Sequence, residues 1–540
     1  MLAVATPPHP PALAAPSPSN LDPATPTPTH IAFVTWPAVG HVTPMMDFAL
    51  ALLDAQPHTI LSFLTSPDMV AFLDRAGHTR SEFGSRLRII PTGSEALGDN
   101  PLDDEPMKLT EAAKGVDKNT SLLKTMRAAT QIAVHFREVF PLLLADKPVA
   151  DVPSAGAPVT SVVCNWMTFG IDQLVKAIAP STKLFSFFDH SCFFSTRILG
   201  PRADGGLGGV AGLWAEYCTA TGHVPDDKAE LERQFGRRFG DDVYYIPGSD
   251  IVPIKDCEMS PQAPAYLLDI PITPSLLNIQ GLVERSDAML INTYGCVERH
   301  TLDFLEPSIK TPIVPIGPVM LGRVGAKEGG SAVTSFLDAQ PAASTLYVSF
   351  GTLFRPNPEQ LADMIETLLE EYDIPFVWTL GGQKSLTAEL HSIDVGRVEA
   401  INRKLDAAVA AGKAHICNWV DQHAVLNHPN VGFFLSHGGW NSATETLLAG
   451  KPMILFPFFG DQLFTARVLE ARGVATVINS SIDQPIVDFH ASVTAALSLC
   501  KSDGADRLRQ RARQLQLEVL AERSAAAKEG VWGRIAEILE

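Results

Sequence analysis

Residues 437 to 445 read HGGWNSATE and place an imidazole, an indole, an amide, a hydroxyl and a carboxylate within one short turn. The two glycines allow the backbone to approach a ligand closely, because they have no Cβ. The apolar run before them, VGFFLS (431–436), is typical of a buried strand. Ser442 followed by Glu445 fits a capping box, which predicts a helix that starts at Ala443. Free N–H groups and the positive end of a helix attract anions, so the turn predicts a phosphate-bearing ligand.

Each of these side chains also has an ordinary structural explanation. Ser442 could be only a cap, His437 could be a core histidine bonded to a carbonyl, and Trp440 could be packing. The coincidence of all of them on one turn favours the ligand. A metal is disfavoured, because the nearby histidines lack HxxxH spacing and no cysteine or carboxylate pair completes a ligand set.

The elements that would position this turn form two alternating series of strands and helices. Near-continuous apolar runs that predict buried parallel strands are HIAFVTW (30–36), TILSFLT (59–65), RLRIIP (86–91), TSVVCNW (160–166), KLFSFF (183–188), TLYVSFGT (345–352), PFVWTL (375–380), AHICNW (414–419), VGFFLS (431–436), PMILFP (452–457) and ATVINS (475–480). Helical spacing follows the first run, from Pro44, and recurs around 119–145. The alternation predicts an α/β protein with mainly parallel sheets.

Composition divides the chain and excludes some functions. A tail rich in proline (1–28) precedes an expected first domain (29–310), a linker rich in proline and glycine (311–343), a second domain (344–520) and a last helix (521–540). The net charge of −18 argues against a nucleic-acid partner. No apolar run reaches the length of a membrane span, and no secretory signal begins the chain. We therefore expect a soluble, cytoplasmic monomer.

Two further patterns carry little chemistry. The seven cysteines form no CxxC pair, which favours reduced thiols over a zinc ribbon or a disulfide framework; they are Cys164, Cys192, Cys218, Cys257, Cys296, Cys417 and Cys500. GGLGGVAG (205–212) contains a GxGxxA pattern, but ILGPRAD before it is not a strand. A flexible loop is therefore favoured over a dinucleotide site.

Around the opening turn, a longer pattern resembles the signature box of the family 1 UDP-glycosyltransferases. The matching positions are Trp419, Gln422, His428, HGGWNS (437–442), Glu445, Gly450, Pro452, Pro457, Asp461 and Gln462. Other matching stretches are GHVTP (40–44), SDAMLINTYGCVE (286–298), PIGPV (315–319) and VSFGT (348–352). The resemblance implies a GT-B architecture, in which two Rossmann-like domains face each other across a cleft. It also implies an N-terminal acceptor domain, a C-terminal donor domain and a last helix that returns to the first domain.

The resemblance assigns the donor nucleoside to one end of the box. Trp419 would stack on uracil, the backbone of Val420 would read the base edge, and Gln422 would lie nearby. Glu445 would hold the ribose hydroxyls through charge-assisted hydrogen bonds. Asp421 stands where the family usually has proline, which would alter the turn beside the base.

The same resemblance assigns the rest of the donor. The residues implied to hold the diphosphate are Thr352, His437, Asn441 and Ser442, and those implied to bond the sugar hydroxyls are Trp440, Asp461 and Gln462. A glutamine at the end of the box resembles the members that use glucose. The expected co-substrate is therefore UDP-glucose or another UDP-sugar, with no cofactor and no metal.

The resemblance places the general base at His41, in the loop after the first strand, and an inverting transfer would need such a base. The family usually pairs this histidine with an aspartate, whereas Asn165 stands at that position. An asparagine can orient an imidazole but cannot stabilise an imidazolium by charge. Three interpretations follow: a weaker base that acts on acidic acceptors, substitution by Asp189 or Asp172, or poor catalysis. The first two are jointly favoured.

The acceptor is constrained only by aromatic residues in the first half of the chain. FFDHSCFF (187–194), Trp166, Phe169 and Trp214 could line an apolar pocket or belong to the core. Three functions therefore remain: a glycosyltransferase for a hydroxyl or carboxyl of a small lipophilic acceptor, a glycolipid-forming enzyme for a hydroxy-fatty acid or sterol, and a nucleotide-sugar-binding module with impaired turnover.

Overall fold

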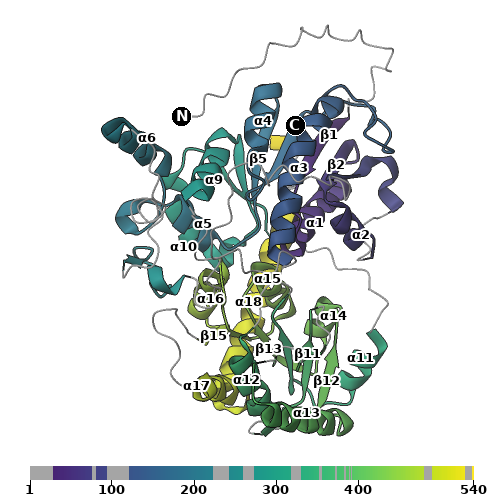
Figure 1. Ribbon diagram of the computed structural model, residues 1–540, viewed down its shortest axis with the longest axis vertical. Helices are drawn as coiled ribbons and strands as arrows, with labels where there is room; N and C mark the ends of the chain where they lie inside the picture. Colours follow the sequence, from purple (N-terminus) through teal and green to yellow (C-terminus); the bar gives the residue numbers. More distant parts are fainter. Residues whose placement is uncertain are drawn as a thin grey trace.

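The computed structural model describes residues 28–75, 81–93, 121–222, 242–259, 273–317, 330–351, 356–370, 374–381, 385–387, 390, 392–478, 489–528, 535 and 538–539. Within them, two parallel sheets with helices on their faces lie one above the other, and the last long helix lies beside both (Figure 1). The predicted α/β class with two Rossmann-like halves is confirmed.

The first sheet has the strand order β3-β2-β1-β4-β5-β8-β9, with every pair parallel. Its strands are β1 (Thr29–Val34), β2 (Thr59–Thr65), β3 (Leu87–Pro91), β4 (Ser161–Asn165), β5 (Lys183–Phe188), β8 (Ala288–Ile291) and β9 (Ile313–Pro315). Its helices are α1 (Val39–Ala55), α2 (Pro67–Arg75), α3 (Ser121–Leu144), α4 (Ile171–Ile178), α5 (Cys192–Leu199), α6 (Val210–Thr221), α9 (Thr273–Arg285) and α10 (Gly295–Leu305). Two short antiparallel strands, β6 (Val243–Tyr244) and β7 (Ile254–Lys255), form a separate two-stranded sheet.

The second sheet has the order β12-β11-β10-β13-β14-β15 and is also parallel throughout. Its strands are β10 (Thr345–Ser349), β11 (Phe376–Thr379), β12 (Ala414–Cys417), β13 (Val431–Ser436), β14 (Met453–Leu455) and β15 (Ala475–Val477). Its helices are α11 (Gly330–Asp338), α12 (Pro358–Glu370), α13 (Val395–Ala410), α14 (Gln422–Asn427), α15 (Trp440–Ala449), α16 (Gln462–Ala471), α17 (Phe489–Ser498) and α18 (Asp503–Lys528).

Both sheets change direction of strand order beside their first strand, between β1 and β4 and between β10 and β13. Ligands of open α/β sheets bind outside the carboxyl ends of strands at such a switch point. GHVTP (40–44) follows β1, and the turn HGG follows β13. The strand order therefore brings the two motifs to the positions where a ligand is expected.

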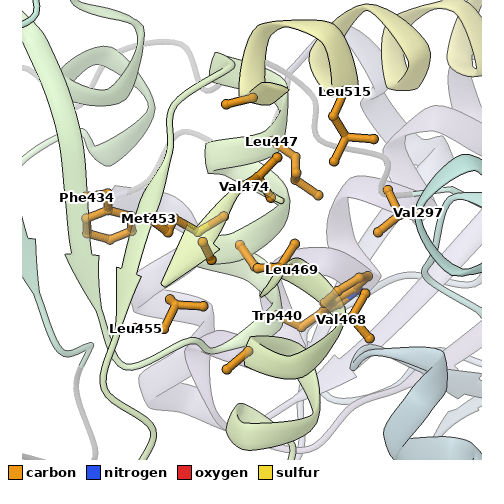
Figure 2. Packing of buried hydrophobic residues seen from close by; sticks show 14 of the residues in the cluster. Val297, Phe434, Trp440, Leu447, Met453, Leu455, Val468, Leu469, Val474 and Leu515 are labelled. Carbon is orange, nitrogen blue, oxygen red and sulfur yellow. The ribbon is translucent and has the colours of Figure 1, made fainter. Parts of the chain in front are cut away.

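The two halves share packing. Val297 of α10 belongs to one buried cluster with Leu447, Val468 and Leu515 of the second half, and Figure 2 shows these side chains together with Trp440. Burial of such apolar area stabilises the association by about 25 cal/mol for each Å² removed from water. Near the end of the chain, Leu539 is fully buried against the first sheet, where its carbonyl accepts the Ser161 hydroxyl.

Two expectations about organisation meet the structure differently. Ile313–Pro315, within the stretch expected as a linker, is the edge strand β9 of the first sheet. No strand precedes the glycines at 205–212, as expected, but these glycines are not merely loop. A Cβ on Gly206 would lie 2.3 Å from the Gly200 carbonyl oxygen, so glycine is required by close backbone packing.

Candidate functional site

His41 lies in the first turn of α1 rather than in a loop, because the helix begins at Val39. Its side chain is 23% exposed, whereas that of Asp189 is 2% exposed. His41 Nδ1 lies 2.8 Å from Asp189 Oδ2. Asp189 follows β5, two strands away from β1 in the sheet, so parallel strand ends bring together residues that are far apart in sequence.

Asn165 and Trp166 at the end of β4 both donate to the same carboxylate. Asn165 Nδ2 lies 2.7 Å from Asp189 Oδ2, and Trp166 Nε1 lies 2.8 Å from Asp189 Oδ1. The Asn165 side-chain oxygen accepts the Met167 N–H at 3.1 Å, which fixes the amide with its NH₂ toward Asp189. Asn165 therefore anchors the acid that lies beside His41.

Asp172, the other candidate for the missing acid, lies elsewhere. Its carboxylate is buried in α4 and pairs with Arg285, with Oδ2 2.5 Å from both Nε and Nη2. This ion pair connects α4 to α9 and leaves Asp172 outside the His41 cluster.

The charges of this cluster are coupled. Burial lowers the pKa of His41, but the Asp189 carboxylate outweighs burial, and the net shift is upward. Burial raises the pKa of Asp189, but His41 outweighs it and the net shift is downward. Asp189 therefore stays ionised and stabilises the imidazolium form of His41.

Aromatic rings surround the imidazole. The His41 ring centroid lies 6.5 Å from that of Trp36 and 6.2 Å from that of Trp166. His190 packs edge-on against Trp166 at 4.7 Å, and burial lowers the pKa of His190 to about 4, so this second histidine is neutral. Phe169 lies 6.5 Å from Trp36. The His41 imidazole thus lies against flat apolar surfaces.

On the opposite side, the HGG turn leads directly into α15. The helix begins at Trp440 with Gly439 as N-cap, three residues before the expected start at Ala443. Ser442 and Glu445 lie inside the helix, and no capping box forms. The reason is steric: Gly438 takes a left-handed φ of 83°, and a Cβ on Gly439 would lie 2.6 Å from His437 Nε2. Helical geometry therefore starts immediately after the second glycine.

Two side chains of this turn bond to the first domain. Trp440 Nε1 donates to the Asn292 carbonyl at 2.6 Å, and the ring is almost fully buried. Asn441 Nδ2 donates to the Gly40 carbonyl at 2.6 Å, directly before His41. The sequence resemblance implies that Trp440 bonds a sugar, but its indole N–H bonds the Asn292 carbonyl instead. Asn441 links the HGG turn (437–439) to the His41 turn.

Two of the residues expected around the nucleoside, Gln422 and Glu445, bond each other, and Gln422 also bonds Ser442, which was expected at the diphosphate. Gln422 Nε2 lies 2.6 Å from Glu445 Oε2 and 3.2 Å from Ser442 Oγ. Trp419 is 45% exposed at the end of β12, whereas Val420 beside it is buried. The exposed indole is available as a stacking surface. Asp421, which replaces the usual proline, caps α14 by accepting the Ala424 N–H at 3.0 Å.

The end of the box lies near the His41 cluster. Burial and the charge of Asp189 raise the pKa of Asp461 to about 7, while His41 lowers it. The charges of both members of the cluster thus act on Asp461, which belongs to the second domain. Gln462 turns its Oε1 inward to the N–H groups of Phe458 and Phe459, at 2.8 and 3.3 Å. Its NH₂ group remains the part that could reach a sugar.

Some expected features lie outside what the structure describes. Thr352 is outside the described residues. Within the described ranges, no group of three or more His, Cys, Asp or Glu could hold a metal ion. Nor is any helix among them long and apolar enough to cross a membrane.

Sequence reasoning missed the contacts that come from backbone carbonyls and from Trp166. The acceptors at Gly40 and Asn292 are main-chain carbonyls, which every residue has, so the residue type does not predict these contacts. The link between Trp166 and Asp189 had such a signal: Trp166 ends one predicted strand, Asp189 directly follows another, and β4 and β5 are neighbours. Side chains at the carboxyl ends of adjacent parallel strands meet at one edge of the sheet.

Comparison with known proteins gives a consistent result. Residues 311–487 match the family model described as UDP-glucoronosyl and UDP-glucosyl transferase. The chain is 26% identical over 459 residues to a flavonol 3-O-glucosyltransferase of Arabidopsis thaliana, covering 82% of each protein. It is 25% identical over 505 residues to an anthocyanidin 3-O-glucosyltransferase of Zea mays, covering 91% of this chain and 92% of the relative.

Solved structures show the same fold. The Medicago truncatula enzyme UGT71G1 complexed with UDP-glucose superposes with a TM-score of 0.68 at 16% identity, over 95% of this chain and 99% of that one. A UDP-glucose:anthocyanidin 3-O-glucosyltransferase in complex with UDP gives 0.65 at 20% identity, over 95% and 98%. With its two Rossmann-like domains and these structural neighbours, the chain has the GT-B fold, and its residues 311–487 match the UDP-glucoronosyl and UDP-glucosyl transferase model.

Proposed function

We propose that this enzyme transfers glucose from UDP-glucose to a hydroxyl of a small aromatic acceptor, with inversion at the anomeric carbon. The observation that carries the proposal is the 2.8 Å contact between His41 Nδ1 and Asp189 Oδ2, beside two tryptophans. A histidine–carboxylate pair next to apolar flat surfaces suits a general base for an aromatic hydroxyl.

In the proposed reaction, His41 Nε2 takes the proton of the acceptor hydroxyl, because Nδ1 faces Asp189. The acceptor oxygen forms a bond to the anomeric carbon while the bond from that carbon to the diphosphate oxygen breaks. UDP leaves with the electron pair. Asp189 stabilises the resulting imidazolium by charge, and Asn165 and Trp166 hold Asp189 in place.

The second domain would bind the donor. Trp419 supplies the stacking surface for uracil, and Glu445 supplies the carboxylate for the ribose. The positive end of the α15 dipole, which lies at the HGG turn, favours the diphosphate. Asp461 and the Gln462 amide nitrogen are proposed to bond the sugar. These roles rest on the family resemblance together with the placement of the residues.

The binding-module alternative was motivated by Asn165. A carboxylate beside His41 removes that motive, since the charge that Asn165 lacks is supplied from β5. A glycolipid-forming enzyme remains the second candidate, because the aromatic surfaces around His41 would also contact a sterol.

The direct test is product analysis with a mixed library of phenols, sterols and hydroxy-fatty acids, each offered with UDP-glucose, UDP-galactose and UDP-glucuronate. We expect glucosides of aromatic hydroxyls by mass spectrometry, with the β configuration by NMR, since the donor is α-linked. Binding of UDP-glucose without release of UDP for any acceptor would contradict the proposal. Glucosylation of sterols or fatty acids alone would favour the second candidate.

A further inference from the structure

A basic pocket lies on the second domain at the end of α15 away from the donor turn. It encloses about 360 Å³ and is lined by Lys451, Arg509 and Arg513 together with small residues and Gln516. None of the described residues that line it is Asp or Glu. Because the ten residues of α15 span about 15 Å, this pocket and the donor turn are separate places.

The shape of the pocket depends on two glycines. A Cβ on Gly432 would lie 2.1 Å from the Ala343 carbonyl oxygen, and a Cβ on Gly450 would lie 2.5 Å from Gln516 Oε1. Ala343 itself has a left-handed φ of 52°, which is unfavourable for a residue with a side chain. Because glycine stands at both positions, no side chain fills the pocket there, and the cationic side chains line it.

The three cations are only partly neutralised. Lys451 Nζ donates to the carbonyls of His428 and Val431 at 3.0 and 2.7 Å, which are neutral partners. Arg509 donates to the Ala343 carbonyl and to the exposed carboxylate of Asp506, and its Nε is buried without a partner.

Arg513 is exposed and has no hydrogen-bond or ion-pair partner among the described residues. Burial, followed by the charges of Arg513 and Arg509, lowers the pKa of Lys451 to about 8. Three like charges around one hollow repel each other, and an anion would remove this repulsion.

We propose that this pocket binds a small phosphate-bearing anion, held by Arg513, Arg509 and Lys451. Guanidinium groups bind phosphate oxygens through two parallel hydrogen bonds, and lysine adds a point charge. The α15 C-terminus carries a partial negative charge that would oppose an anion. Lys451 directly follows its C-cap, and Gln516 Nε2 satisfies the Leu448 carbonyl at 2.6 Å, so this opposition is reduced.

The test is thermal unfolding of the full chain during titration with sodium phosphate or pyrophosphate, against sodium chloride at matched ionic strength. Saturating UDP is present throughout, so that the donor turn is occupied and cannot account for the response. We expect a saturable rise in Tm with phosphate that chloride does not reproduce, because a ligand that binds only the folded state stabilises it.

Variants separate the pocket from general charge effects. Arg513→Gln should raise the half-saturating phosphate concentration about tenfold, since it removes charge-assisted hydrogen bonds. Lys451→Met should do the same, although it also frees two carbonyls and lowers the starting Tm. Arg507→Gln, an exposed arginine of α18 that does not line the pocket, should respond as the wild type does. Equal responses to phosphate and chloride, or a wild-type response in Arg513→Gln, would overturn the proposal.

Discussion

The region around His41 in the first domain and the HGG turn (437–439) of the second domain are built from different interactions. On the first domain, His41 pairs with the Asp189 carboxylate, which two neutral donors, Asn165 and Trp166, hold in place. On the second domain, the donor turn relies on backbone N–H groups and on neutral side chains whose bonds reach across to Gly40 and Asn292. Charge is concentrated where a proton would move, and neutral donors lie where a diphosphate would bind. Changes on the two sides should therefore affect different kinetic constants.

The largest effect is expected for His41→Ala. Loss of a general base typically lowers the rate 10²- to 10⁴-fold, so we expect kcat to fall by about that factor. The affinity for UDP, measured by calorimetry, should stay within about threefold, because His41 belongs to the first domain. A kcat close to that of the wild type would remove His41 from the mechanism.

On the donor side, Trp419→Ala should raise KM for UDP-glucose roughly tenfold. Stacking of a base on an aromatic side chain is worth about 1–3 kcal/mol, and Trp419 is the exposed ring. kcat at saturating donor should change little, since stacking acts equally before and during transfer. His423→Ala, three residues after the buried Val420, is the matched control. A lowered kcat with unchanged KM would contradict the separation of the two sides.

A second carboxylate at position 165 tests the role of Asn165 as the residue that holds Asp189. Asn165→Asp alone would place a second carboxylate 2.7 Å from Asp189 Oδ2, which raises one carboxyl pKa above its unfolded value. Such a group stabilises the fold below its unfolded pKa, and this contribution is lost as pH rises through the folded pKa. The Tm difference from the wild type should therefore widen from about pH 4 to pH 8.

The double variant Asn165→Asp/Asp189→Asn is the companion to that measurement. It restores one carboxylate and one amide with their positions exchanged, so both the stability at pH 8 and part of the activity should return. If the double variant is as unstable at pH 8 as Asn165→Asp, repulsion between the two carboxylates is not the cause.

The smallest effect is expected for Asp421→Ala, beside the nucleoside surface. An N-cap side chain contributes about 1 kcal/mol, so we expect Tm to fall by a few degrees. kcat should be unchanged, because Asp421 bonds the backbone of α14 and not the donor. A large rise in KM for UDP-glucose would show that this position contacts the base after all.

The donor turn and the base cluster differ in how well their sequence predicts them. The turn is contiguous, so spacing within 419–462 predicts its place between a strand and a helix, with an error of three residues in the helix start. The error arises because the sequence predicts a capping box at Ser442 and Glu445, whereas Gly438 and Gly439 already complete the turn and the helix starts at Trp440. Strand runs such as 59–65 and 183–188 are reproduced with the same bounds, since buried parallel strands are apolar throughout.

The cluster of His41, Asn165, Trp166 and Asp189 is assembled at the ends of three strands, and the sequence alone leaves the acid beside His41 open between Asp189 and Asp172. The choice depends on strand order, because β5 lies beside β4 while Asp172 points to α9. The order of strands in a sheet is set by tertiary packing and cannot be predicted from local sequence. The contacts of Trp440 and Asn441 across the cleft were missed for a related reason: their acceptors are backbone carbonyls of a distant segment.

The pairing of His41 with Asp189 is tested most directly by the pH profile of kcat for Asp189→Asn. UDP-glucose is kept saturating, because the pKa of Asp461, a proposed sugar ligand, is also raised to about 7 and could change donor binding over the same pH range. Asp172→Asn serves as the control carboxylate. Asp189 raises the pKa of His41, and a general base acts above its pKa. We therefore predict that Asp189→Asn lowers kcat by roughly 10²- to 10⁴-fold and moves its acid limb to lower pH. An unchanged kcat and an unchanged acid limb in Asp189→Asn would contradict the account.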